Sequence, residues 1–245
     1  MKTKSILITG STSGIGFDIA KSLSKLEGYK IILNGRNMLK LKFAKKSIPN
    51  SNFFLCDVTK YKDLKSLSKK IKSLDILICN VGNSKSVKPG KEKIQDWKKS
   101  LDENFFSTIN TINFFEKKLI KSKGIIICIS SICGLEYIKG APLTYSVSKS
   151  ALNTFIRYYS KILGPKGVKL NGIAPGNILF KGSTWEKKLK KNKRSVNLML
   201  KKDVSMRKLG TLKDISGLVE FLVKSNSDFI NGSIFVVDGG QIKRF

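Results

Sequence analysis

Histidine is absent from this chain of 245 residues. It is the side chain that most often moves protons near neutral pH, so proton transfer here must use a carboxylate, a thiol, a lysine or a phenol. Cysteine is scarce as well, and the four cysteines form no CxxC pair. We therefore expect no metal site, and we expect the cysteines to be reduced core residues of a cytoplasmic protein.

Long apolar runs are missing too. No run approaches the ~18 apolar residues of a membrane span, and the first apolar stretch, Ile6-Leu7-Ile8, is too short for a secretory signal. The pattern therefore predicts no membrane partner. Hydrophobic residues still make up 41% of the chain, which is enough for a globular core.

Acidic residues and arginine are few beside lysine. The chain has 17 Asp and Glu against 47 Lys and Arg, which gives a formal net charge of +30. Such a charge attracts nucleic-acid phosphates, but only five of the basic residues are arginine, the side chain favoured for bidentate recognition. The lysines are also spread over the whole chain. A general lysine bias is therefore favoured over a nucleic-acid partner, and attraction to anionic cofactors and substrates follows in either case.

Short β-branched runs alternate with longer segments of helical periodicity. This alternation predicts parallel βαβ units in one domain over residues 1–245, an α/β doubly wound parallel sheet of about seven strands with helices on both faces. Strands are expected at residues 5–9, 30–34, 52–56, 75–80, 124–130, 168–174 and 233–237. Helices are expected to begin near Ile15, Met38, Lys60, Glu92, Pro142, Thr184 and Thr211.

A glycine-rich loop joins the first expected strand to the first expected helix. It reads Thr9-Gly10-Ser11-Thr12-Ser13-Gly14-Ile15-Gly16. Glycine lets the backbone turn sharply and approach a ligand, while the N-terminus of the following helix presents free N–H groups and a positive dipole end. The GxxxGxG spacing differs from the GxGxxG fingerprint, and a tight turn without a ligand is the alternative. The position at the first strand–helix junction favours a dinucleotide pyrophosphate site.

Tyr145 and Lys149 are four residues apart and would share one face of a helix. An ammonium group beside a phenol favours the phenolate, so we expect the pKa of Tyr145 to lie below its usual value of ~10. Pro142 is expected in the first turn of that helix, whose positive end would act in the same direction. In so lysine-rich a chain, the spacing alone fits an exposed helix face equally well.

Taken together, these elements resemble the short-chain dehydrogenase/reductase family, and within it the 3-oxoacyl-(acyl-carrier-protein) reductases. Further family marks follow in order: Cys56-Asp57-Val58, Asn80-Val81-Gly82, Asn104, Ser131, Asn171 with Pro175-Gly176, and Val237-Asp238-Gly239-Gly240. The resemblance covers essentially the whole chain. It implies a single-domain Rossmann fold that reduces a carbonyl, such as a 3-oxoacyl thioester or a sugar-like ketone, to a secondary alcohol by hydride transfer. An NAD-linked alcohol dehydrogenase and a catalytically idle, basic or nucleic-acid-binding protein are the alternatives.

The resemblance also implies residue roles. Tyr145 would be the general acid, Lys149 would lower its pKa and hold the nicotinamide ribose, and Ser131 would bind the substrate oxygen. Asn104 would support a water that relays protons to Lys149. Ser131 is preferred to Ser130 because Ile132-Cys133-Gly134 after it fits the family's serine–two residues–glycine pattern. The implied cofactor-binding residues are Gly10, Ser11, Ser13, Gly14, Ile15, Gly16, Arg36, Asp57, Val58, Asn80, Gly82, Tyr145, Lys149, Pro175, Gly176 and Ile178.

The end of the second expected strand bears on the choice of cofactor. An NAD site usually has Asp or Glu ~20 residues beyond the glycine loop, and Asn34-Gly35-Arg36-Asn37 carries no carboxylate. Arg36 offers a bidentate donor to a 2′-phosphate, which favours NADP(H), with NAD(H) as the alternative. The other interpretation of Arg36 is an ordinary surface residue.

Two positions depart from the family pattern. Val81 replaces the usual alanine, and Phe180 replaces a threonine that holds the nicotinamide carboxamide. Ser183 and Thr184 are candidates for the missing hydroxyl, and Phe180 is a candidate for packing over the site. The resemblance further implies a substrate lid around residues 180–205. Its basic run, residues 187–194, either attracts an anionic small-molecule or carrier-bound substrate or is a solvated helix face.

Two expected helices carry more apolar residues than one side of a sheet requires. These residues are Phe105, Phe106, Phe114 and Phe115 on one helix and Leu152, Phe155, Ile156 and Tyr159 on the other. The resemblance implies that these helices pair across a dimer axis. We therefore expect a homodimer or a homotetramer.

Overall fold

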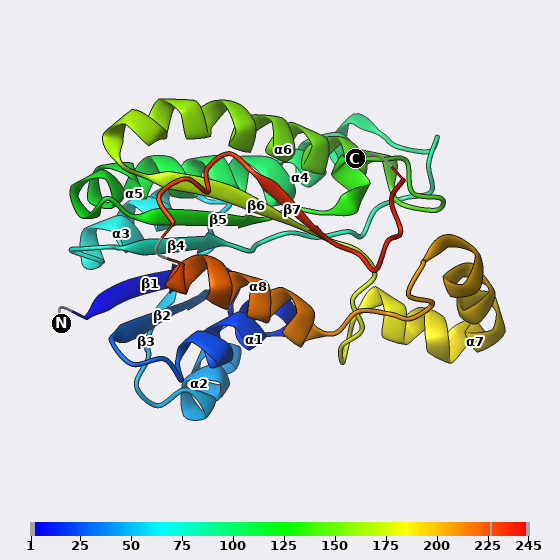
Figure 1. Cartoon of the computed structure of the whole chain (residues 1–245), viewed down its shortest axis with the longest axis horizontal. Helices are drawn as coiled ribbons and strands as arrows, with labels where there is room; N and C mark the ends of the chain where they lie inside the picture. The colour runs from blue at the N-terminus through cyan, green and yellow to red at the C-terminus, as the bar shows by residue number, and fades with distance from the viewer. Residues whose placement is uncertain (1–2, 226, 244–245) are drawn as a thin grey trace.

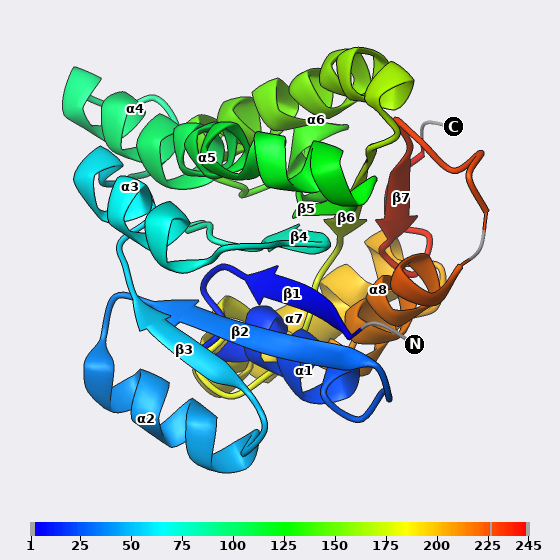
Figure 2. The same ribbon diagram turned by 90° about the vertical axis from the view of Figure 1, so that its left-hand side faces the viewer.

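The computed structural model describes residues 3–225 and 227–243. This part of the chain forms one sheet of seven parallel strands in the order β3-β2-β1-β4-β5-β6-β7 (Figures 1 and 2). The strands are β1 (Lys4–Ile8), β2 (Tyr29–Gly35), β3 (Asn52–Leu55), β4 (Ile76–Cys79), β5 (Ile125–Ile129), β6 (Lys169–Pro175) and β7 (Ile234–Val237). The predicted doubly wound Rossmann fold is confirmed, and each strand boundary lies within one residue of its expected position.

Helices cover both faces of the sheet. Figure 2 shows α1 (Gly14–Leu23), α2 (Met38–Ser47) and α8 (Leu212–Lys224) on one face. The other face carries α3 (Tyr61–Lys70), α4 (Ile94–Leu101), α5 (Ser107–Ser122) and α6 (Leu143–Leu163). A helix begins within two residues of each expected start, and α5 begins at Ser107, where no start was expected. Their N-terminal signals are local, which is why the sequence alone placed them well.

The two layers create two cores. Ile6 and Ile8 of β1 point into the core beneath α1, α2 and α8, whereas Leu7 between them points into the core beneath α3, α5 and α6. All three side chains are fully buried, because a strand turns successive residues to opposite faces and both faces are covered. The continuous apolar run is thus explained by two-sided burial.

Helix α7 (Thr184–Asp203) extends beyond the carboxyl ends of the strands (Figure 1). It is broken at Asn192, whose φ of −157° and ψ of 84° are not helical. The Asn192 side chain accepts a hydrogen bond from Ser195 N at 2.9 Å and so caps the second half. Val196, Leu200 and Val204 form a small separate core with Trp185 and other apolar residues of this segment.

Part of the surface expected to form an oligomer lies inside the subunit. Phe115, Leu152 and Ile156 are fully buried in the second core, the one beneath α3, α5 and α6, so they are not available to a partner. The expectation is wrong for these residues because two helices beside a sheet already need this apolar surface for their own packing. In the described residues no helix is both long enough and apolar enough to cross a membrane.

Candidate active site

A cavity of about 630 Å³ opens at the carboxyl ends of the strands. Strand order reverses between β1 and β4 at this edge, which is where doubly wound sheets bind their ligands. The structure brings nine of the predicted site residues to its wall: Ile15, Asn80, Gly82, Ser131, Tyr145, Lys149, Pro175, Gly176 and Ile178. The other predicted residues lie behind this wall or outside it.

The glycine loop is held against the end of β2. Ser11 is fully buried; its N–H donates to Asn34 O at 2.9 Å, and its hydroxyl accepts from Asn34 N at 2.9 Å. Gly14 has a φ of +56°, which favours glycine, and the N-terminus of α1 follows directly. Ser13 at the N-cap makes no side-chain hydrogen bond to the helix, so the first-turn N–H groups are not capped by it. The loop thus retains free backbone donors for an anion.

Asn80 and Asn34 position this loop from either side. The Asn80 amide donates to Thr9 O at 3.1 Å and to Gly10 O at 3.2 Å. The Asn34 amide donates to Cys56 O at 3.1 Å, and Asn34 is buried. In the sequence, position 34 stands out only because it carries no carboxylate. Its contacts cross between strands that are distant in sequence, so no local signal pointed to them.

Ser131 begins a short 3-10 turn, Ile132–Gly134, directly after β5. Its hydroxyl accepts a hydrogen bond from Cys133 N at 3.1 Å, which fixes the turn at the cavity wall. Gly134 lets the turn approach α6, because a Cβ there would lie 2.4 Å from the Lys149 carbonyl carbon. The neighbouring Ser130 is used elsewhere, donating to Asn153 Oδ1 at 2.6 Å. The preference for Ser131 thus has a structural reason.

Tyr145 lies in the first turn of α6 and lines the cavity with Ser131. Burial raises the pKa of its phenol well above the usual value, and a hydrogen bond with Ser131 opposes this only in part. The expectation of a lowered pKa is therefore wrong for the chain by itself. The expectation that Pro142 lies in the first turn of this helix is also wrong, because Pro142 is the N-cap residue that precedes the turn. The phenol stays protonated at neutral pH, the form that a proton donor requires.

Lys149 is buried beneath the cavity, and its Nζ donates to Ile129 O at 2.8 Å. Burial lowers its pKa from 10.5 to about 8. The Nζ also lies 5.9 Å from the centre of the Tyr145 ring. Because the ammonium group is directed to a backbone carbonyl, its effect on the phenol is smaller than the spacing of the two residues suggests.

Asn104 lies behind Lys149, in a π-helical turn, Asp102–Phe106, between α4 and α5. Its Oδ1 accepts from Asn83 N at 2.7 Å, and its Nδ2 donates to Ser100 O at 3.0 Å. A Cβ placed on Gly82 would lie 3.0 Å from Asn104 Oδ1 and 3.3 Å from Lys149 Nζ. The two polar groups therefore face the same small space, which glycine leaves open at position 82.

Three residues predicted to bind the adenosine half of the cofactor do not line the cavity: Arg36, Asp57 and Val58. Arg36 follows β2, its side chain is 69% exposed, and Nη1 lies 3.9 Å from Asp57 Oδ2. The Asp57 carboxylate also accepts from Thr59 N at 3.1 Å. The Val58 side chain is buried in the second core, so only its backbone is available to a ligand. Exposed Arg36 and partly buried Asp57 thus form one charged pair at the ends of β2 and β3.

Both residues that depart from the family pattern, Val81 and Phe180, pack against the glycine loop. A Cβ on Gly14 would lie 2.9 Å from the Phe180 ring, and one on Gly10 would lie 3.0 Å from Val81. The Ser183 hydroxyl is buried and accepts from Glu186 N at 3.1 Å as the N-cap of α7. Ser183 and Thr184 both line the cavity, and because the Ser183 hydroxyl already caps α7, Thr184 is the preferred candidate for the missing hydroxyl.

Known proteins are similar to this chain over almost its whole length. The family model described as Enoyl-(Acyl carrier protein) reductase matches residues 10–241. The 3-oxoacyl-[acyl-carrier-protein] reductase FabG of Rickettsia prowazekii is 32% identical over 241 residues, which cover 98% of this chain and 97% of that protein. Dehydrogenase/reductase SDR family member 4 of Mus musculus is 28% identical over 256 aligned residues, covering 100% of this chain and 89% of that protein.

The solved structures show the same fold. L-sorbose reductase from Gluconobacter frateurii, complexed with NADPH and L-sorbose, superposes with a TM-score of 0.91 at 23% identity, covering 100% of this chain and 98% of that one. At this identity the similarity concerns the fold alone. It places the present sheet among known Rossmann-type folds.

Proposed function

The chain belongs to the short-chain dehydrogenase/reductase family of oxidoreductases acting on alcohol and carbonyl groups, and on this premise we propose that it is an NADP(H)-dependent carbonyl reductase. The supporting observation is that Ser131, Tyr145 and Lys149 meet in one cavity beside the glycine loop. We propose a 3-oxoacyl thioester or a sugar-like ketone as substrate. The reductase from Rickettsia prowazekii acts on 3-oxoacyl groups, and the Gluconobacter enzyme binds L-sorbose.

The residues present fit a dinucleotide. The glycine loop and the uncapped N-terminus of α1 offer backbone donors to a pyrophosphate, and Gly82 leaves an open approach beside Lys149. Arg36 would hold a 2′-phosphate, with its exposed guanidinium group available for the contact. When bound, the cofactor supplies the hydride for the carbonyl carbon. NAD(H) remains the alternative, since Asp57 lies close to Arg36 and reduces its positive potential.

In this proposal the chain's own groups handle the oxygen and the proton. The Ser131 hydroxyl binds the carbonyl oxygen, and Tyr145 donates its phenolic proton to that oxygen as negative charge develops. Lys149 and Asn104 face a common space beside Gly82, from which a water would return the proton. Because burial raises the pKa of Tyr145, its phenol is protonated at neutral pH and can supply the proton that reduction requires.

Replacing the proton donor tests the function. In Tyr145→Phe the ring remains but the acidic oxygen is lost, so we expect kcat to fall by about 10²–10⁴-fold. Affinity for NADPH should change less than about twofold, because the ring still packs in place. Both are measured from NADPH absorbance, with ethyl acetoacetate as the ketone, and from NADPH titration.

Tyr137→Phe is the matched control, because Tyr137 also lines the cavity but its side chain is exposed. It should retain activity. Normal turnover in Tyr145→Phe would show that another group donates the proton.

Three further features are proposed with this function. Residues 180–205 act as a substrate lid, supported by the position of α7 at the cavity and by its separate small core. The chain forms a homo-oligomer through α5 and α6, supported by the exposed Phe106, Tyr158 and Ile162 beside the partly buried Phe155. A cytoplasmic location is supported by four free cysteines, three of them buried.

A further inference from the structure

The described wall of the cavity carries more positive than negative side chains. Among the described residues that line the cavity, five are lysines, namely Lys139, Lys149, Lys188, Lys202 and Lys243, and two are carboxylates, Glu136 and Asp203. The proposed mechanism uses only Lys149. Glu136 already accepts a hydrogen bond from Lys243 N at 2.8 Å. The wall thus has positive charges that neither the cofactor nor the proton transfer requires.

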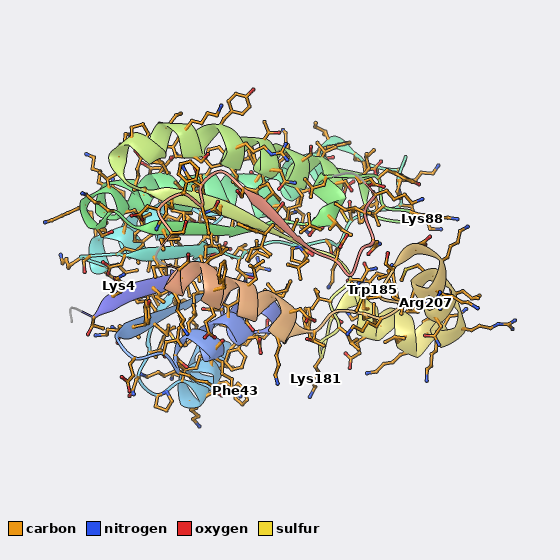
Figure 3. All side chains as sticks on the ribbon, viewed as in Figure 1. Lys4, Phe43, Lys88, Lys181, Trp185 and Arg207 are labelled. Carbon is orange, nitrogen blue, oxygen red and sulfur yellow. The ribbon has the colours of Figure 1, made fainter. Side chains whose placement is uncertain are left out.

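Lys188 differs from the rest of its basic run. In the described structure it is the only residue of 187–194 that lines the cavity. Its Nζ lies 4.4 Å from the centre of the Trp185 ring, and Trp185 also lines the cavity. In Figure 3 Trp185 lies where the α7 segment meets the body of the molecule. A cation–π contact of this kind restricts a side chain that would otherwise be free in solvent.

Lys188 acts on the same small region as the reacting hydroxyls. Burial raises the pKa of the Cys133 thiol, and the positive charge of Lys188 opposes this rise. Cys133 lies two residues after Ser131, and its N–H donates to the Ser131 hydroxyl. A charge on Cys133 would in turn raise the pKa of Tyr145. Lys188, Ser131 and Tyr145 also line the same cavity.

The charge of Lys188 is not neutralised by its helix. The ion pair found within α7 joins Lys190 to Glu186 at 3.3 Å. Within the described residues no carboxylate lies in ion-pair distance of Lys188. An ammonium group held by an aromatic ring at a cavity wall is suited to bind an anion from the cavity side.

We propose that Lys188, positioned by Trp185, binds an anionic group carried by a compact carbonyl substrate, such as the carboxylate of an oxo acid or the phosphate of a small phosphorylated ketone. The inference rests on the proposed reductase function and narrows its substrate class. The anion lies on the Lys188 side of the cavity while Ser131 and Tyr145 hold the carbonyl oxygen. A compact substrate brings its anion into the same cavity as its carbonyl, whereas a carrier arm separates its phosphates from the carbonyl by the whole pantetheine chain.

A pair of ketones with the same reacting group tests the proposal. Acetoacetate carries a carboxylate, and ethyl acetoacetate is its neutral ester. In Lys188→Gln we expect kcat/KM for acetoacetate to fall about tenfold, mainly through KM, because the contact is made in ground and transition states alike. For the ester it should change less than about twofold. Lys187→Gln removes the same charge from the same helix outside the cavity wall and should affect neither ketone.

The outcomes separate this inference from the proposed function. Reduction of the ester by the wild type supports the function alone. An equal loss for both ketones in Lys188→Gln, or no loss for either, overturns the role of Lys188. Acetoacetyl-coenzyme A is the third substrate, and a tenfold loss confined to it would assign Lys188 to carrier recognition and overturn the compact substrate.

A binding measurement covers the case in which neither ketone is reduced. Acetoacetate and inorganic phosphate are titrated separately into the wild type and Lys188→Gln with NADP⁺ present, using calorimetry. Binding of at least one probe about tenfold more tightly to the wild type supports the proposal and distinguishes carboxylate from phosphate. Equal binding of both probes to the two proteins overturns it.

Discussion

At the scale of single residues, burial decides the chemistry of this site. Tyr145 and Lys149 have the spacing of an activated phenol–ammonium pair, yet burial raises the pKa of the phenol and lowers that of the ammonium. Both shifts disfavour the charged form, which is the effect of removing an ionisable group from water. Tyr145 is therefore a protonated donor, and Lys149 is a lysine that titrates close to neutral pH.

The buried lysine should make stability depend on pH. The pKa of Lys149 is about 8 when folded and 10.5 when unfolded, so between these values the unfolded chain binds more protons. The free energy of unfolding should rise with pH in this window, by up to about 1.4 kcal/mol per pH unit from this group. Below pH 8 both states are protonated and the contribution is constant. Urea unfolding of the wild type and Lys149→Met from pH 7 to 10.5 measures it, and parallel curves for the two proteins would contradict it.

Arg36 provides a second prediction at this scale. Arg36→Asp places a carboxylate where a 2′-phosphate would bind, so we expect the ratio of kcat/KM for NADPH to that for NADH to fall by at least about tenfold. The Arg36 side chain is 69% exposed, so its replacement should leave folding unchanged. Steady-state kinetics with both cofactors measures the ratio. Arg157→Asp, on α6, should leave it unchanged, whereas an unchanged ratio in Arg36→Asp would place cofactor choice elsewhere.

At the scale of elements, the site depends on short segments that join strands to helices. The turn after β5 reaches α6 because position 134 is glycine, and the glycine loop is held by Asn34 and Asn80. Helix α7 is different, because its second half packs mainly within the small core of Val196, Leu200 and Val204. An element with few contacts to the main cores is expected to open locally before the whole fold does.

The cap at the break in α7 should control this local opening. Asn192→Ala removes the acceptor for Ser195 N, which costs about 1 kcal/mol of helix stability. Hydrogen exchange of residues 195–203 should accelerate about fivefold, while exchange in β4 and β5 stays unchanged. Asn192→Asp keeps a capping oxygen and is the control. Uniform acceleration over the whole chain would contradict a local role.

At the scale of the whole molecule, apolar residues remain exposed on one side of α6. Tyr158 and Ile162 are four residues apart and 73% and 53% exposed, so they form a continuous face on this helix. Phe106 is also exposed, at 44%, in the π-helical turn that packs against α6. Exposed apolar faces of this kind mark interaction surfaces in soluble proteins, which agrees with a homo-oligomer.

Charges on this face should dissociate the oligomer. In a Tyr158→Lys, Ile162→Lys double variant we expect a shift from dimer or tetramer to monomer at micromolar concentration, with little change in the free energy of unfolding of the subunit. Sedimentation velocity measures the shift. Phe43→Lys on α2, at a residue that is 69% exposed, is the control and should leave assembly unchanged. A wild-type chain that is monomeric at this concentration would contradict the prediction.

The sequence by itself determined the strands, the helix starts, the sheet class and the set of candidate site residues. Apolar runs such as Ile6-Leu7-Ile8 and the glycine loop act through local periodicity and turn geometry, which neighbouring residues encode. Only the tertiary structure decided the direction of the Tyr145 pKa, the use of the Ser183 hydroxyl as a helix cap, and the position of Lys188 at the cavity wall. These depend on burial and on contacts between residues far apart in the chain, which no local pattern contains.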